Sequence, residues 1–141
     1  MENHVKNSIL IVDDDKSNLL VLNDILNQDY TLYLARSGRD AIEKANGNLP
    51  DLILLDIIMP GMDGYDVLAA LKDSDKTRHI PVIFITGLSD PEAEKKGLSL
   101  GAADYISKPF SHAIVKLRVQ NQIKIINHSL QILIHLYPIF L

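Results

Sequence analysis

The 141-residue chain contains no cysteine and no tryptophan, and only 6% of its residues are aromatic. Without cysteine, the protein has no disulfide, no thiolate metal ligand and no cysteine nucleophile. The few aromatic side chains offer little surface on which the ring system of a flavin would stack. These absences exclude thiol chemistry and disfavour a flavin-binding protein.

The sequence also lacks an excess of basic charge, a signal peptide and an apolar run of membrane-spanning length. The formal net charge of −4 provides no electrostatic attraction for nucleic acid. Residues 1–7 are polar, and the first apolar run ends in acidic residues, unlike a signal peptide. The apolar segment 130–141 is too short to cross a bilayer. With 47% hydrophobic residues, we expect a cytoplasmic globular protein that directly contacts neither nucleic acid nor a membrane.

Short apolar runs alternate with amphipathic segments along the chain. Strands are predicted over residues 8–12, 30–35, 52–56, 81–85 and 103–106, and helices are predicted to begin near residues 17, 37, 63, 89 and 111. Uninterrupted apolar runs such as Leu52–Leu55 are typical of strands buried on both faces. Parallel strands joined by helices need helices on both faces of the sheet. We therefore predict an α/β fold, a flavodoxin-like (βα)5 three-layer sandwich with a parallel sheet of order 2-1-3-4-5.

Three helix starts carry capping residues. Ser37 is positioned to cap the second helix, which Asn46-Gly47 should end after Ala45. Asp15 and Asp63 are each expected to cap the helix that follows. These two carboxylates are therefore interpreted as structural and not as ligands.

Polar side chains follow four of the five predicted strands: Asp13 and Asp14, Asp56, Thr86, and Lys108. In the order 2-1-3-4-5 these four strands are consecutive neighbours about 4.8 Å apart. Their carboxyl ends lie at the edge where open α/β sheets bind ligands. The sequence therefore predicts that these side chains share one pocket.

Three carboxylates in one pocket repel each other, and a divalent cation such as Mg²⁺ removes that conflict. Lys108 adds a positive charge that can pair with an anion, and Thr86 adds a hydroxyl. A carboxylate beside a metal, a lysine and a hydroxyl suits phosphoryl transfer, because positioning and charge neutralisation dominate that reaction. The carboxylate itself can become an acyl phosphate.

The chain resembles the receiver domains of two-component response regulators, the CheY-like superfamily. The resemblance covers about residues 8–120 and rests on Val12-Asp13-Asp14, Asp56 to Gly64, Thr86-Gly87, Gly101 to Tyr105 and Lys108-Pro109-Phe110. It implies a switch that takes a phosphoryl group from a sensor histidine kinase or a phosphotransfer protein. The switch then controls an output or dimerisation, and it is not an enzyme acting on a separate substrate.

The resemblance also implies roles for the residues of the acidic pocket. Asp56 is expected to be the phosphoacceptor. Asp14 is expected to bind Mg²⁺ directly and Asp13 largely through water, with Asp56 and the backbone carbonyl of Ile58 completing the protein ligands. Lys108 is expected to contact the phosphoryl oxygens.

Two further expectations follow from the same resemblance. The Lys108–Pro109 bond is expected to be cis. Thr86 and Tyr105 are expected to form a switch pair, in which Tyr105 turns inward as Thr86 moves toward the phosphoryl group. On residue type alone, these two would be a strand residue and a packing residue.

Two other functions compete with the receiver as interpretations of this sequence. A haloacid-dehalogenase-type phosphatase also uses aspartate and Mg²⁺, but it places its nucleophile after the first strand in an Asp-x-Asp pattern, whereas Asp13 and Asp14 are adjacent. A flavodoxin-like cofactor binder needs a phosphate-cradling loop after the first strand, which this sequence lacks. Both rank below the receiver.

Two apolar residues are expected to flank the phosphoryl site. Ile58 lies two residues beyond Asp56, and Leu88 lies two residues beyond Thr86. Neither side chain can hydrogen-bond an attacking water. We therefore expect the aspartyl phosphate to hydrolyse slowly and the signal to persist.

The C-terminal part of the chain carries a heptad pattern. Val119, Ile126, Leu133 and Phe140 repeat every seven residues, with Ile123, Leu130 and Tyr137 between them. The segment Val115 to Gln122 resembles receivers joined to cyclic-dinucleotide enzymes.

We expect a disordered tail over residues 1–7, a receiver domain over 8–122 and a helical extension over 123–141. The extension should find nothing in the domain to pack on from Ile123 onward, and Pro138 should break its helix. It would mediate a homodimer or lead to an output domain that is missing here. The alternative is the end of a truncated chain that folds back onto any apolar surface.

Overall fold

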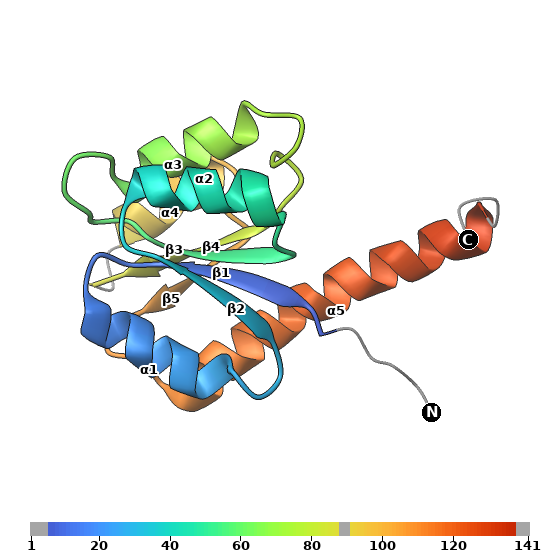
Figure 1. Cartoon of the computed structure of the whole chain (residues 1–141), viewed down its shortest axis with the longest axis horizontal. Coiled ribbons are helices and arrows are strands. Elements are labelled where there is room, and N and C mark those ends of the chain that lie inside the picture. The colour runs from blue at the N-terminus through green and yellow to red at the C-terminus, as the bar shows by residue number, and fades with distance from the viewer. Residues whose placement is uncertain (1–5, 88–90, 138–141) are drawn as a thin grey trace.

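The computed structural model describes residues 6–87 and 91–137, in which five strands alternate with five helices (Figure 1). In chain order the elements are β1 Ser8–Val12, α1 Lys16–Leu26, β2 Thr31–Ala35, α2 Gly38–Asn48, β3 Leu52–Asp56, α3 Gly64–Lys72, β4 Val82–Thr86, α4 Pro91–Ser99, β5 Asp104–Ser107 and α5 His112–Leu136. The predicted alternation is confirmed.

The five strands form one parallel sheet in the order β2-β1-β3-β4-β5, as predicted. Val12 at the end of β1 lies opposite Ala35 of β2 on one side and Leu55 of β3 on the other. The residues that follow β1 therefore come close to both the end of β3 and the connection that leaves β2. This register determines which side chains meet at the carboxyl edge of the sheet.

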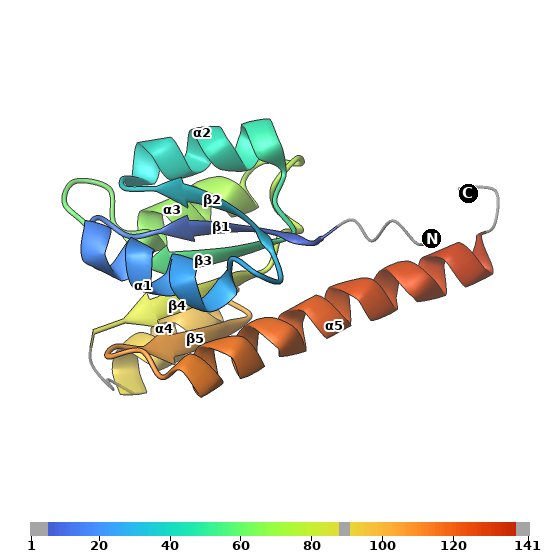
Figure 2. The same cartoon turned by 60° about the horizontal axis from the view of Figure 1, so that its bottom comes forward.

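Helices cover both faces of the sheet, with α1 and α5 on one face and α2, α3 and α4 on the other (Figures 1 and 2). Alternate residues of each strand point into two separate cores. Leu10 and Ile53 belong to the α2–α3 side, whereas Ile9 and Leu54 belong to the α1–α5 side. All five residues of β3 are buried. The apolar run before Asp56 is thus the central strand that its composition predicts.

The predicted N-caps are confirmed, but the predicted end of α2 is wrong. Asp15 accepts a hydrogen bond from the Ser17 N–H, and Asp63 forms a capping box with Asp66. Helix α2 runs through Asn46-Gly47 to Asn48, and Leu49 closes it with a left-handed φ of 46°. The helix stops there because the residue before a proline avoids the helical conformation, and Pro50 follows. An isolated glycine weakens a helix without ending it.

Helix α5 packs on the sheet one turn further than expected and then projects beyond it (Figure 2). Ile123 is only 8% exposed, and Ile126 packs against the same core, so the expectation that the extension leaves the domain at Ile123 is wrong. Asn127 exchanges side-chain hydrogen bonds with Asn7 at this point.

Beyond Asn127 the apolar side chains of α5 are largely exposed, Leu130 by 54%. Among the described residues, no helix is long and apolar enough to cross a membrane. The expected helix break at Pro138 and the heptad position Phe140 lie outside the described residues.

Candidate functional site

Three carboxylates meet at the carboxyl edge of the sheet. Asp13 and Asp14 follow β1, and Asp56 is the last residue of β3. Each offers an oxygen, and these atoms lie within 4.8 Å of one another. The pairing of β1 with β3 brings them together, as the sequence predicts.

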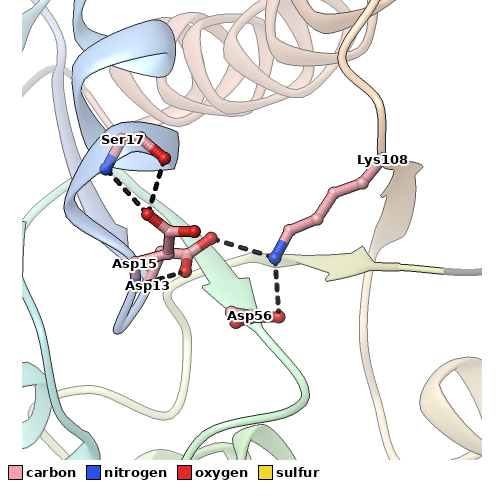
Figure 3. Close-up of polar contacts among 5 residues, drawn as sticks. All are labelled: Asp13, Asp15, Ser17, Asp56 and Lys108. Carbon is pink, nitrogen blue, oxygen red and sulfur yellow. Dashed lines mark hydrogen bonds and ion pairs between the residues drawn. The ribbon is translucent and has the colours of Figure 1, made fainter.

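Lys108 reaches the same cluster from the segment that follows β5 (Figure 3). Its Nζ lies 3.2 Å from Asp13 Oδ2 and 3.5 Å from Asp56 Oδ1. The Lys108 N–H donates to the Thr86 carbonyl at 2.7 Å, which holds the lysine backbone beside the end of β4. The Lys108–Pro109 peptide bond is cis, as expected.

The charges of this cluster are poorly compensated. Burial, followed by the negative charge of Asp13, raises the pKa of Asp56 from its usual 3.8 to about 6, while Lys108 and the Ile58 N–H act in the opposite direction. Asp56 is only 4% exposed. At neutral pH the ionised Asp56 therefore lowers the stability of the folded protein unless a further positive charge lies nearby.

The Asp13 carboxylate also lacks a partner, in this case a hydrogen-bond donor for one of its oxygens among the described residues. It is completely buried, and its Oδ1 accepts from the Asp15 N–H at 2.9 Å. Its Oδ2 faces the Lys108 ammonium but accepts no well-directed hydrogen bond from the described residues. Buried carboxylate oxygens are normally hydrogen-bonded, paired or bound to a metal. The three carboxylates, together with the Asp13 Oδ2 atom that accepts no well-directed hydrogen bond, fit a hard divalent cation such as Mg²⁺.

Thr86 and Tyr105 lie on the β4 and β5 side of this cluster. Thr86 ends β4 and is buried, and Lys108 is anchored to its carbonyl. Tyr105 is half-buried on β5, and its ring faces the Arg118 guanidinium at 5.8 Å. A hydrogen bond from its hydroxyl to Glu94 of α4 is the main reason why the pKa of Tyr105 is raised. The tyrosine is thus held between α4 and α5.

The loop between β3 and α3 makes close contacts that sequence reasoning missed. The Gly64 N–H donates to the Ile57 carbonyl at 2.8 Å, and a Cβ at Gly64 would lie 2.5 Å from the Asp56 carbonyl oxygen. The Asp63-Gly64 pair signalled only a turn. The close approach depends on where the loop returns to the sheet, which no local pattern reports.

The residues expected to flank the phosphoryl group are partly described. The Ile58 side chain is 76% exposed, and its N–H donates to the Asp56 carboxylate. Leu88 lies outside the described residues. The expectation of slow hydrolysis therefore stays a prediction.

Comparisons with known proteins agree with this geometry. Residues 9–120 match the family model of the response regulator receiver domain. The chain is 45% identical over 124 residues to a Vibrio cholerae serotype O1 protein named "Probable cyclic di-GMP phosphodiesterase", covering 88% of this chain and 28% of that protein. It is 42% identical over 114 residues to the response regulator PleD of Caulobacter vibrioides, covering 80% of this chain and 25% of PleD.

Solved structures give the same result. The signal receiver domain of a signal transduction histidine kinase from Syntrophus aciditrophicus has a TM-score of 0.76 and 37% identity, covering 84% of this chain and 90% of that chain. None of these matches supports the haloacid-dehalogenase-type alternative. The chain spans only about a quarter of the length of the two curated relatives.

Proposed function

Because this chain belongs to the response regulator receiver domain family, we propose that Asp56 is the residue that accepts its phosphoryl group. One oxygen of the Asp56 carboxylate attacks the phosphorus of a phosphohistidine on a kinase or phosphotransfer protein. A new P–O bond forms as the P–N bond breaks, and the imidazole leaves with the electron pair of that bond. The observation that carries the proposal is the Lys108 ammonium lying between the Asp13 and Asp56 carboxylates.

The other side chains of the cluster have supporting roles. Asp13, Asp14, Asp56 and the Ile58 carbonyl would hold Mg²⁺, which neutralises charge on the phosphoryl oxygens when bound. Lys108 provides a second positive charge, already 3.5 Å from Asp56 Oδ1, for the phosphoryl oxygens of the product. Asp56 is buried, so its carboxylate is largely shielded from bulk water.

The phosphorylated state would be read by Thr86 and Tyr105. The Thr86 hydroxyl would hydrogen-bond the phosphoryl group, and Tyr105 would move inward from its position between Glu94 and Arg118. Both partners of Tyr105 would then lose a contact. The local charge change would thereby reach α4 and α5.

The extension of α5 would carry that change to an output segment or to a second copy of the chain. Leu130 and Leu133 are about half exposed, and they continue the helix stripe whose earlier members Val119 and Ile123 are buried on the sheet. The matched region is also only part of each curated relative. These two observations support a connecting or pairing role for the extension.

Mass spectrometry after incubation with acetyl phosphate and Mg²⁺ tests the phosphoacceptor. We expect a single phosphoryl adduct on the wild-type protein and none on Asp56→Asn. The matched control is Asp24→Asn, which removes an exposed carboxylate of α1 and should keep the adduct. A phosphoryl adduct on the Asp56→Asn protein would show that another residue is the phosphoacceptor.

We expect Ile58→Asn to shorten the lifetime of the acyl phosphate severalfold. The isoleucine side chain is exposed beside Asp56 and cannot hydrogen-bond water, whereas an amide can orient a water toward the phosphorus. The measurement is the decay of the purified phosphoprotein after removal of the donor, with Ile58→Val as the apolar control. An unchanged decay rate in Ile58→Asn would remove the basis for a persistent signal.

A further inference from the structure

The segment that joins β2 to α2 contacts the two aspartates that follow β1 and the loop that follows Asp56. It runs from Ala35, the last residue of β2, through Arg36 and Ser37 to Gly38, the first residue of α2, and none of these residues carries a carboxylate. We propose that Arg36 and Gly38 are positioning residues that set the geometry of the Mg²⁺ site. The inference rests on the proposed function, because that function places Mg²⁺ at this cluster.

The first contact orients the carboxylates that follow β1. The Asp13 N–H donates to the Ala35 carbonyl at 3.1 Å, and Arg36 Nη2 donates to the Asp14 carbonyl at 3.2 Å. That carbonyl belongs to the same peptide plane as the Asp15 N–H, which donates to Asp13 Oδ1 at 2.9 Å.

One peptide plane is therefore held from two sides. Arg36 fixes its oxygen, and the Asp13 carboxylate accepts from its nitrogen. Because the plane is rigid, a rotation that breaks one hydrogen bond weakens the other. Arg36 thereby helps to keep Asp13 Oδ2 directed toward Lys108 and limits the movement of Asp14.

The second contact supports the loop that follows Asp56. A Cβ added to Gly38 would lie 2.9 Å from the Cβ, Cγ and Sδ atoms of Met62. Met62 therefore lies directly on the Gly38 backbone, at the first residue of α2. The same loop carries Ile58 at its start, so this contact limits how far the loop can move from the sheet.

The charge of Arg36 allows its positioning role to be separated from simple electrostatics. A guanidinium beside a cation site repels the cation, so loss of the charge alone would tighten Mg²⁺ binding. Loss of the hydrogen bond to Asp14 would loosen the carboxylates and weaken binding. The two explanations predict opposite signs for the same substitution.

Isothermal titration of the full chain with Mg²⁺ tests the role of Arg36. We expect Arg36→Met to raise the Kd about fivefold, the effect of one modest hydrogen bond. The control is Arg39→Met, which removes an exposed positive charge three residues further on. Arg39→Met should leave the Kd unchanged within about twofold. Among the described residues, no hydrogen bond or ion pair joins Arg39 to the acidic cluster.

The outcomes separate the inference from the proposed function. If the wild-type protein binds Mg²⁺ and Arg36→Met binds it equally well or more tightly, the positioning role of Arg36 is wrong and the Mg²⁺ site stands. If the wild-type protein does not bind Mg²⁺, the proposed site fails and the inference fails with it. Phosphoryl uptake by Arg36→Met at saturating Mg²⁺ should return to the wild-type rate, because the residue acts through metal binding.

A second pair of variants tests the contact at Gly38. We expect Gly38→Ala to raise the Kd for Mg²⁺ about tenfold by displacing Met62, and Met62→Ala to restore most of the affinity when combined with it. Gly47→Ala is the control in the same helix, because the Cβ it would add lies within 4 Å of no described atom outside its own turn of helix. Circular dichroism verifies that each variant is folded. Wild-type affinity in folded Gly38→Ala, or no recovery in the double variant, would contradict the role of Gly38.

Discussion

Gly64→Ala is expected to destabilise the protein by about 3 kcal/mol, the upper part of the range for overpacking. The added Cβ would lie 2.5 Å from the Asp56 carbonyl oxygen and 2.7 Å from the Ile57 Cα. Both atoms are backbone, so they cannot move aside as the end of a flexible side chain does. The Gly64 N–H also donates to the Ile57 carbonyl at 2.8 Å, which holds the two segments at this distance. Alanine therefore has to displace the end of β3 or the start of α3.

Urea unfolding followed by circular dichroism measures this effect as a lower transition midpoint with an unchanged slope. Gly47→Ala is the matched control, since it makes the same substitution inside α2, where the added Cβ lies within 4 Å of no described atom outside its own turn of helix. It should raise stability by up to about 1 kcal/mol, the helix-propensity difference between alanine and glycine. A Gly64→Ala protein as stable as the wild type would show that the β3–α3 loop adjusts freely. The position of Asp56 would then not depend on this contact.

Asp56→Asn is expected to stabilise the metal-free protein by about 2 to 3 kcal/mol at pH 7. Burial and the charge of Asp13 raise the pKa of Asp56 from 3.8 to about 6, and each pKa unit corresponds to about 1.4 kcal/mol. Between pH 3.8 and about 6 the folded protein keeps a proton on this carboxyl that the unfolded chain has lost. The contribution of Asp56 to stability therefore falls as pH rises through this window. Asparagine has a similar shape and no charge, so it avoids that loss.

The measurement is the free energy of unfolding in the presence of EDTA from pH 4 to pH 7. The difference between Asp56→Asn and the wild type should be small near pH 4 and should grow toward pH 7. Asp24→Asn removes an exposed carboxylate and should follow the wild-type curve. Adding Mg²⁺ should narrow the difference, because a ligand that binds only the folded wild type stabilises it. A variant that is less stable than the wild type at pH 7 would mean that the Lys108 ion pair outweighs burial and repulsion.

Local patterns predicted most of the fold and all the members of the acidic cluster. The apolar runs of strand length that end in Asp13 and Asp56 can be recognised in the sequence. A strand buried on both faces tolerates a charged residue only where it leaves the protein core. The N-caps at Asp15 and Asp63 could also be predicted from the sequence, because capping involves residues only two or three positions apart. Such signals need no knowledge of distant contacts.

The predictions that failed concern competition between local signals and packing. Gly47 suggested the end of α2, yet the helix continues to Asn48 and ends before Pro50. Ile123 was expected to leave the domain, yet it is buried on the sheet, and the exposed part of α5 begins one turn later. The end of α2 is thus set by Pro50, a local signal stronger than Gly47. The packed length of α5 depends instead on the surface of the sheet that it covers, which the sequence of the helix does not contain.

The sequence by itself determined which chemical groups stand at the strand ends, because strand length and polarity place them there. Only the tertiary structure decided how those groups are held. The Lys108 ammonium lies between two carboxylates because β5 is separated from β1 by two strands of a twisted sheet. Arg36 contacts Asp14, and Gly38 contacts Met62 in the loop after Asp56, because β2 pairs with β1 and ends beside it. These contacts join residues that are 22 and 24 positions apart, and no short-range pattern encodes a distance of that kind.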